Sequence, residues 1–100
     1  MSVIVIGKFN GEPARLAKIF RARAAEFEAV AAEAKTNGAL HHCIVAGDGH
    51  ALVIDEWESV EAFQSFLASQ EMMGKLMQEA GFQGLPDFTF YSPMAVPGEF

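Results

Sequence analysis

The sequence contains a single cysteine, Cys43, among its 100 residues. A lone cysteine cannot form a disulfide within the chain, and free thiols are typical of reducing compartments. We therefore expect a cytoplasmic protein whose fold depends on a hydrophobic core. No charged segment precedes the short aliphatic run Val3 to Ile6, so we also expect no secretory signal.

Long hydrophobic runs and an excess of positive charge are missing as well. The run Val3 to Ile6 is the longest aliphatic one, far below the roughly 20 residues of a membrane-spanning helix. Seven basic against thirteen acidic residues give a net charge of -6, which opposes binding to a phosphate backbone. The sequence therefore predicts neither a membrane nor a nucleic-acid partner.

Motifs for nucleotide binding and serine hydrolysis are absent, since there is no glycine-rich phosphate loop and no Gly-x-Ser-x-Gly segment. The nearest approach to a metal site is His41 and Cys43, which would share one face of a strand, with His50 on the next strand. Zinc sites usually have closely spaced pairs such as Cys-x-x-Cys. A thiol beside two histidines at a sheet edge is the simpler interpretation, so we expect no metal and no other cofactor.

What the sequence does contain is apolar residues, at 51% against 20% charged. This composition is typical of a folded chain, and 100 residues suffice for one domain spanning 1–100. A domain this small cannot easily hide so many apolar side chains in its own core. The composition therefore predicts a homo-oligomer.

Hydrophobic spacing and turn residues predict six elements. Strands are expected over residues 2–9, 40–46, 50–57 and 87–91, with one helix over 13–36 and another that begins after residue 59 and extends to about residue 80. The order strand, helix, strand, strand, helix, strand is that of the ferredoxin-like α+β fold, a four-stranded antiparallel sheet with two helices on one face. Because the first strand is apolar on both faces, a second copy should cover the other face. We therefore expect a homodimer of the dimeric α/β barrel type.

The segment from Val53 to Phe63, which reads VIDEWESVEAF, is followed by Leu67-Ala68-Ser69. It resembles the antibiotic biosynthesis monooxygenase-like family of the dimeric α/β barrel superfamily, in which an acid, one residue and a tryptophan end the third strand and a serine begins the second helix. The resemblance implies a dimeric barrel. Members include cofactor-independent oxygenases of aromatic polyketides, haem-degrading enzymes, isomerases and proteins without known activity.

The chain departs from that family at several positions. Phe66 stands where many relatives carry a histidine early in the second helix, and another histidine is missing near Glu71. The haem-degrading branch has an axial histidine later in that helix, where this chain reads Gly74 to Met77, and an asparagine inside the first strand, where only Asn10 lies nearby. Haem degradation is therefore disfavoured.

A histidine and a carboxylate are expected to meet in the hairpin. If Asp48-Gly49 is a two-residue turn, His42 lies opposite Asp55, on the same face as Trp57; with a three-residue loop, His41 takes the place of His42. Either pair could serve as a general base, since a carboxylate fixes the imidazole tautomer and raises its basicity. The alternative is an ordinary polar pair across two strands.

Four further side chains are candidates for binding an apolar ligand between sheet and helices: Trp57, Phe66, Met77 and Tyr91. The family resemblance favours Trp57 as a pocket residue, whereas core packing is the ordinary alternative for Phe66 and Met77. The Tyr91 hydroxyl could hydrogen-bond a ligand oxygen, although a strand tyrosine half exposed to water is the more common situation. We therefore expect a cofactor-independent enzyme, monooxygenase- or isomerase-like, that acts on an apolar or aromatic small molecule. The alternative is a non-catalytic ligand-binding or stress-associated barrel, favoured if no histidine reaches the cavity.

Overall fold

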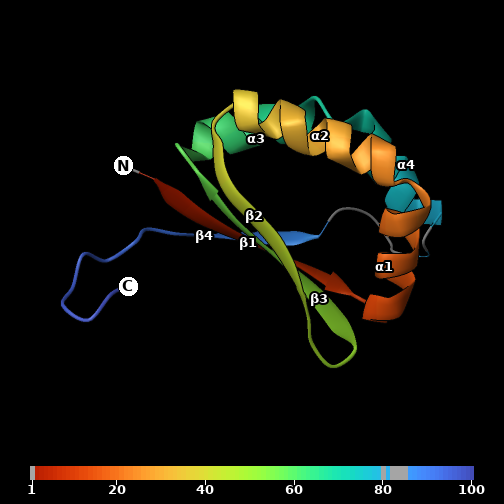
Figure 1. The fold of residues 1–100 in the computed structure, drawn as a ribbon, viewed down its shortest axis with the longest axis horizontal. Coiled ribbons are helices and arrows are strands. Elements are labelled where there is room, and N and C mark those ends of the chain that lie inside the picture. The colour runs from red at the N-terminus through yellow and green to blue at the C-terminus, as the bar shows by residue number, and fades with distance from the viewer. Residues whose placement is uncertain (1, 80, 82–85) are drawn as a thin grey trace.

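The computed structural model describes residues 2–79, 81 and 86–100. The strands are β1 (Val3–Asn10), β2 (Ala39–Ala46), β3 (His50–Trp57) and β4 (Asp87–Tyr91), and the helices are α1 (Pro13–Ala22), α2 (Ala24–Thr36), α3 (Val60–Ala68) and α4 (Glu71–Glu79). The strands form one antiparallel sheet in the order β2-β3-β1-β4, and these helices arch over one of its faces (Figure 1). The predicted ferredoxin-like fold is confirmed. No helix among the described residues is long and apolar enough to cross a membrane.

The expected first helix is in fact two helices, which is the first correction. Arg23 has φ −122° and ψ 39°, outside the helical region, and α1 ends there before α2 begins. Phe20 and Phe27 stack across the break with ring centroids 4.0 Å apart. Arg23 itself reaches over to α4, where its guanidinium lies 2.7 Å from a carboxylate oxygen of Glu79. The bend lets the two halves follow the curved sheet rather than run straight past it.

The expected second helix is also divided, at Ser69 and Gln70. The Ser69 hydroxyl donates a hydrogen bond to the Phe66 carbonyl at 2.6 Å, and the backbone N–H of Gln70 donates to the Leu67 carbonyl. Such local bonds compete with the regular helical pattern and end α3. The start of α3 is as predicted, because the Ser59 side chain accepts a hydrogen bond from the N–H of Ala62. The expected end near Ala80 lies outside the described residues.

The core lies between the sheet and the helices, in two clusters. One joins β1 and β3 to α1 and α4 through Phe9, Leu16, Ala51, Leu76 and Met77. The other joins the opposite ends of the same strands to α3 through Val3, Val5, Trp57 and Phe63. The space between the two clusters is where the cavity described below opens.

The outer face of the sheet, turned away from the helices, carries an apolar patch. Its apolar side chains alternate with the core residues along each strand and are Ile4, Ile6, Cys43, Val45, Leu52, Ile54 and Tyr91. Polar residues, among them Lys8, His41 and Glu56, share this outer face. Helices cover the opposite face only (Figure 1). Part of this face is open to solvent, since Val45 is 40% and Tyr91 53% exposed.

Gly7 provides a test of the packing on the helix side of β1. An alanine Cβ at this position would lie 2.7 Å from Cε1 of Phe88, the residue opposite it on β4. We expect Gly7→Ala to lower the free energy of unfolding by roughly 1 to 3 kcal/mol, because the ring must move. Gly74→Ala in α4 is the matched control. It meets nothing within 4 Å and should stabilise the protein slightly in the same urea titration, because alanine is the better helix former. Equal effects of the two changes would contradict the packing at Gly7.

Candidate active site

A cavity of about 460 Å³ lies between the sheet and helices α2, α3 and α4. Its wall is mostly apolar and rich in aromatic rings, to which Phe9, Phe20, Phe27, Trp57, Phe63, Phe66 and Phe88 contribute. Small side chains of α2, among them Ala31 and Ala34, leave the space that the rings enclose. Cavities of this size and character bind small apolar molecules.

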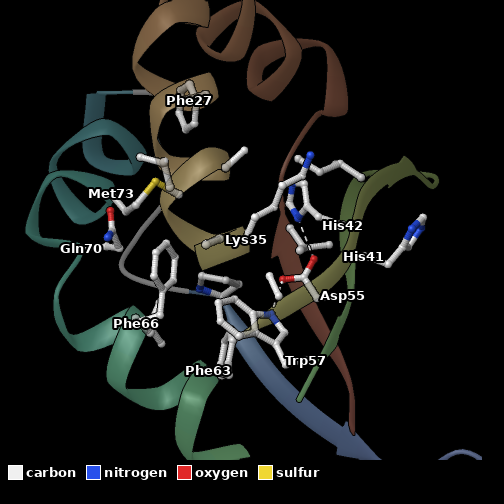
Figure 2. Close-up of a pocket in the computed structure, with 18 of the residues that line it drawn as sticks. Phe27, Lys35, His41, His42, Asp55, Trp57, Phe63, Phe66, Gln70 and Met73 are labelled. Atoms are coloured by element: carbon white, nitrogen blue, oxygen red, sulfur yellow. Dashed lines mark hydrogen bonds and ion pairs between the residues drawn. The ribbon is translucent and has the colours of Figure 1, made fainter. Parts of the chain in front are cut away.

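A hydrogen-bonded trio forms the polar part of the wall (Figure 2). His42 Nδ1 lies 2.6 Å from Asp55 Oδ1, and the indole N–H of Trp57 donates to Asp55 Oδ2 at 3.1 Å. With Asp55 ionised, Nδ1 carries the hydrogen and donates, so Nε2 is left with a lone pair. Asp55 Oδ1 therefore holds one tautomer of His42, while the bond from Trp57 to Oδ2 fixes the orientation of the carboxylate.

The hairpin sets this geometry. The backbone N–H of Gly47 donates to the carbonyl of His50 at 2.8 Å, which leaves Asp48 and Gly49 as a two-residue turn. Gly49 has φ +72°, a conformation that favours glycine. The resulting register places His42 opposite Asp55, the first of the two arrangements that the sequence left open.

Burial differs within the trio. The Asp55 and His42 side chains are 10% and 50% exposed, and Trp57 is buried. The pKa of His42 is raised above 6.5, first because its ring hydrogen-bonds to Asp55; burial opposes this rise, and the negative charge of Asp55 adds to it. A buried carboxylate thus supports an imidazole that remains accessible from the cavity side.

The structure places most of the other predicted residues in the cavity wall, but not all of them. Phe66 and Met77 line the cavity, as does Trp57. His41 contributes to the wall, but its register partner is Glu56 and its ring is directed away from the cavity (Figure 2). Tyr91 must be corrected, because it pairs with Ile4 on the outer face and does not belong to the described lining.

The histidine and cysteine considered for a metal do not assemble into a site. Among the described residues, no group of three or more histidine, cysteine, aspartate or glutamate side chains could hold a metal ion. Cys43 faces outward with Ile54 as its register partner.

Three polar lining residues were not predicted from the sequence: Glu28 and Lys35 of α2, and Gln70 between α3 and α4. A signal for Lys35 existed. It lies four residues after Ala31 and eight after Phe27, so helical spacing places it at the edge of the apolar stripe of α2. Gln70 could not be found in this way, because it lies where the predicted helix is interrupted.

The fold and cavity together define a class of protein: a ferredoxin-like α+β domain with an aromatic pocket between sheet and helices. No protein-family model and no curated protein matches the sequence. Solved structures do match the fold.

Three of these structures show what the chain is similar to. SnoaB, a cofactor-independent oxygenase from Streptomyces nogalater, has a TM-score of 0.65 at 17% identity, over 98% of both chains. A provisionally named antibiotic biosynthesis monooxygenase from Deinococcus radiodurans has a TM-score of 0.62 at 16% identity, over 98% of both chains. One from Caulobacter crescentus has 0.62 at 18% identity, over 93% of this chain and 90% of that one. The chain therefore has the fold of antibiotic biosynthesis monooxygenase-like proteins, as the segment around Trp57 predicted.

Proposed function

We propose that this protein is a cofactor-independent enzyme, monooxygenase-like in kind, that removes a proton from an apolar or aromatic substrate held in the cavity. The observation that carries the proposal is the His42–Asp55 pair, with its 2.6 Å hydrogen bond, in the wall of a largely apolar pocket. The fold shared with a cofactor-independent oxygenase supports it.

The proposed chemistry follows from the tautomer of His42. Nε2 accepts the proton of a substrate O–H or activated C–H bond, and the electron pair of that bond stays on the substrate as a phenolate or carbanion. Asp55 stabilises the imidazolium that forms, because it already accepts the Nδ1–H. In an oxygenation, the carbanion forms a C–O bond to dioxygen, which is the oxidant; the peroxide takes the proton back from His42, and its O–O bond breaks with loss of water to leave a carbonyl group. In an isomerisation, the anion takes the proton at a different carbon.

The second candidate is a ligand-binding protein without catalysis. It is favoured by Phe66, which lines the cavity where many of the resembled enzymes carry a histidine. The two candidates differ in whether a bound ligand loses a proton.

Proton exchange separates them directly. We expect the wild-type protein to exchange acidic C–H hydrogens of polycyclic phenols and ketones, such as anthrone, for deuterium in D2O, with oxygen uptake followed in parallel. His42→Gln should lower the exchange rate by about two to four orders of magnitude, the usual contribution of a general base. Asp48→Asn, in the exposed turn, should leave it unchanged. Ligands that bind without exchange or oxygen uptake in the wild type would favour the binding protein.

We further propose a homodimer that buries the outer face of the sheet. Apolar side chains on this face have no helix over them, and the tail that follows β4 carries more, with Met94 73% and Val96 51% exposed. A second copy related by a two-fold axis could cover the face with the same face of its own sheet. The variants that test this are given in the Discussion.

A further inference from the structure

One cation belongs to the cavity wall without a role in the chemistry above. Among the described lining residues, Lys35 is the only lysine or arginine. It lies in the last turn of α2 and is exposed, and it forms no ion pair with another described residue. The acidic groups of the same wall are Asp55, which is bonded to His42 and Trp57, and Glu28.

The two ends of the wall differ in charge. Glu28 and Lys35 are both on α2, seven residues apart, which is about 10 Å along a helix axis. Helix α2 packs on β2, the strand that carries His42, and Figure 2 shows Lys35 extending from the helix toward that strand. Gln70, from the segment between α3 and α4, is the neutral polar group of the wall. A positive charge thus accompanies the base at the His42 end.

We propose that the Lys35 ammonium stabilises the oxyanion that a substrate acquires when His42 takes its proton. The inference rests on the proposed function and assigns a further residue to the same site. The oxygen that loses its proton lies between Nε2 of His42 and Nζ of Lys35, and the carbon skeleton lies among the aromatic rings.

The physical reason is the cost of an anion in an apolar cavity. Without a partner, the phenolate loses its hydration and its pKa rises. A nearby ammonium offsets that cost for the anion, while it contributes little to binding of the neutral phenol. The charge of Lys35 also interacts favourably with the C-terminal end of α2, so a test must distinguish substrate ionisation from helix stability.

Ionisation of a bound phenol provides such a test, with 4-nitrophenol as the probe. Its phenolate absorbs visible light, so the pKa of the bound molecule can be titrated at saturating protein. We expect this pKa to lie below that of free 4-nitrophenol in the wild type and to be higher by about 0.5 to 1 unit in Lys35→Met, a three- to tenfold loss in acidity. Lys35→Arg should restore most of the effect. Lys75→Met, an exposed change on α4 outside the described lining, should leave the pKa as in the wild type.

A second ligand controls for damage to the cavity. The methyl ether 4-nitroanisole has nearly the same shape but cannot ionise, so its dissociation constant should be unchanged by Lys35→Met. Ala31→Trp, which fills the cavity, should weaken both ligands and show that they bind there.

Three outcomes would overturn the inference. They are an unlowered probe pKa in the wild type, an equal pKa in Lys35→Met, and a loss of 4-nitroanisole binding as large as the change in phenol ionisation. Failure of the proposed function is seen separately, as deuterium exchange that does not depend on His42. The titration of bound 4-nitrophenol therefore tests Lys35, and the deuterium exchange tests His42, so each proposal can fail without the other.

Discussion

Asp55→Asn is expected to reduce turnover by about a hundredfold or more, within the range that general bases contribute, while changing ligand affinity little. The amide keeps the shape of the carboxylate but not its charge. It can present its NH2 group to Nδ1, which would favour the tautomer with hydrogen on Nε2 and remove the lone pair that accepts the substrate proton. The loss should appear in kcat rather than in KM, because the misplaced hydrogen matters only when the proton is transferred.

The same variant can be tested without a substrate. The pKa of His42, raised in the wild type mainly by the Asp55 hydrogen bond, should fall in Asp55→Asn. An NMR titration of the three histidines in both proteins measures this change, with Asp48→Asn as a control in which His42 should titrate as in the wild type. If the pKa of His42 is the same in Asp55→Asn as in the wild type, the two side chains do not form a hydrogen-bonded pair, and the argument for catalysis fails.

Because the pKa of His42 is raised, the stability of the folded protein should depend on pH. The raised pKa means that the folded protein binds a proton at His42 more tightly than the unfolded chain, whose histidine titrates near 6.5. This contribution is fully present below about pH 6.5 and is lost as the pH rises through the pKa of the folded protein. The stability difference between wild type and Asp55→Asn should therefore be larger at pH 5.5 than at pH 8.5.

The central pair of the site could be predicted because it depends on local sequence. Asp48-Gly49 specifies a two-residue turn, and the turn alone determines that His42 faces Asp55. The helix boundaries were less predictable. Nothing at Arg23 marks a break, since neither glycine nor proline is near, and the bend there accompanies the contact between Arg23 and Glu79, which lie 56 residues apart.

Tyr91 was placed in the cavity wrongly, although strand alternation contained the answer. Phe88 packs against the buried cluster around Trp57, and Phe90 contacts Phe63, so residues 88 and 90 face the helices. Tyr91 must then point outward with Thr89. The hydroxyl of Tyr91 is a suitable ligand group, but its position in the strand places it on the face opposite the cavity.

Ile4→Asp combined with Ile6→Asp is expected to convert the dimer to a monomer. Both side chains lie on the outer face, away from the core clusters, so the two carboxylates would be placed in the proposed interface and repeated by the second copy. Burying unpaired carboxylates in an apolar interface carries a desolvation cost that opposes association. Light scattering at micromolar concentration should give close to twice the 10.8 kDa chain mass for the wild type and the mass of one chain for the variant.

The control is Asn10→Asp, which adds negative charge at the exposed end of the same strand and face, and it should remain dimeric. Circular dichroism and near-ultraviolet fluorescence of Trp57 should show that the double variant is still folded, because the helix-covered core is unchanged by it. A folded double variant with the mass of two chains would place the interface elsewhere, whereas a wild type with the mass of one chain would leave the apolar outer face exposed to solvent in the functional protein.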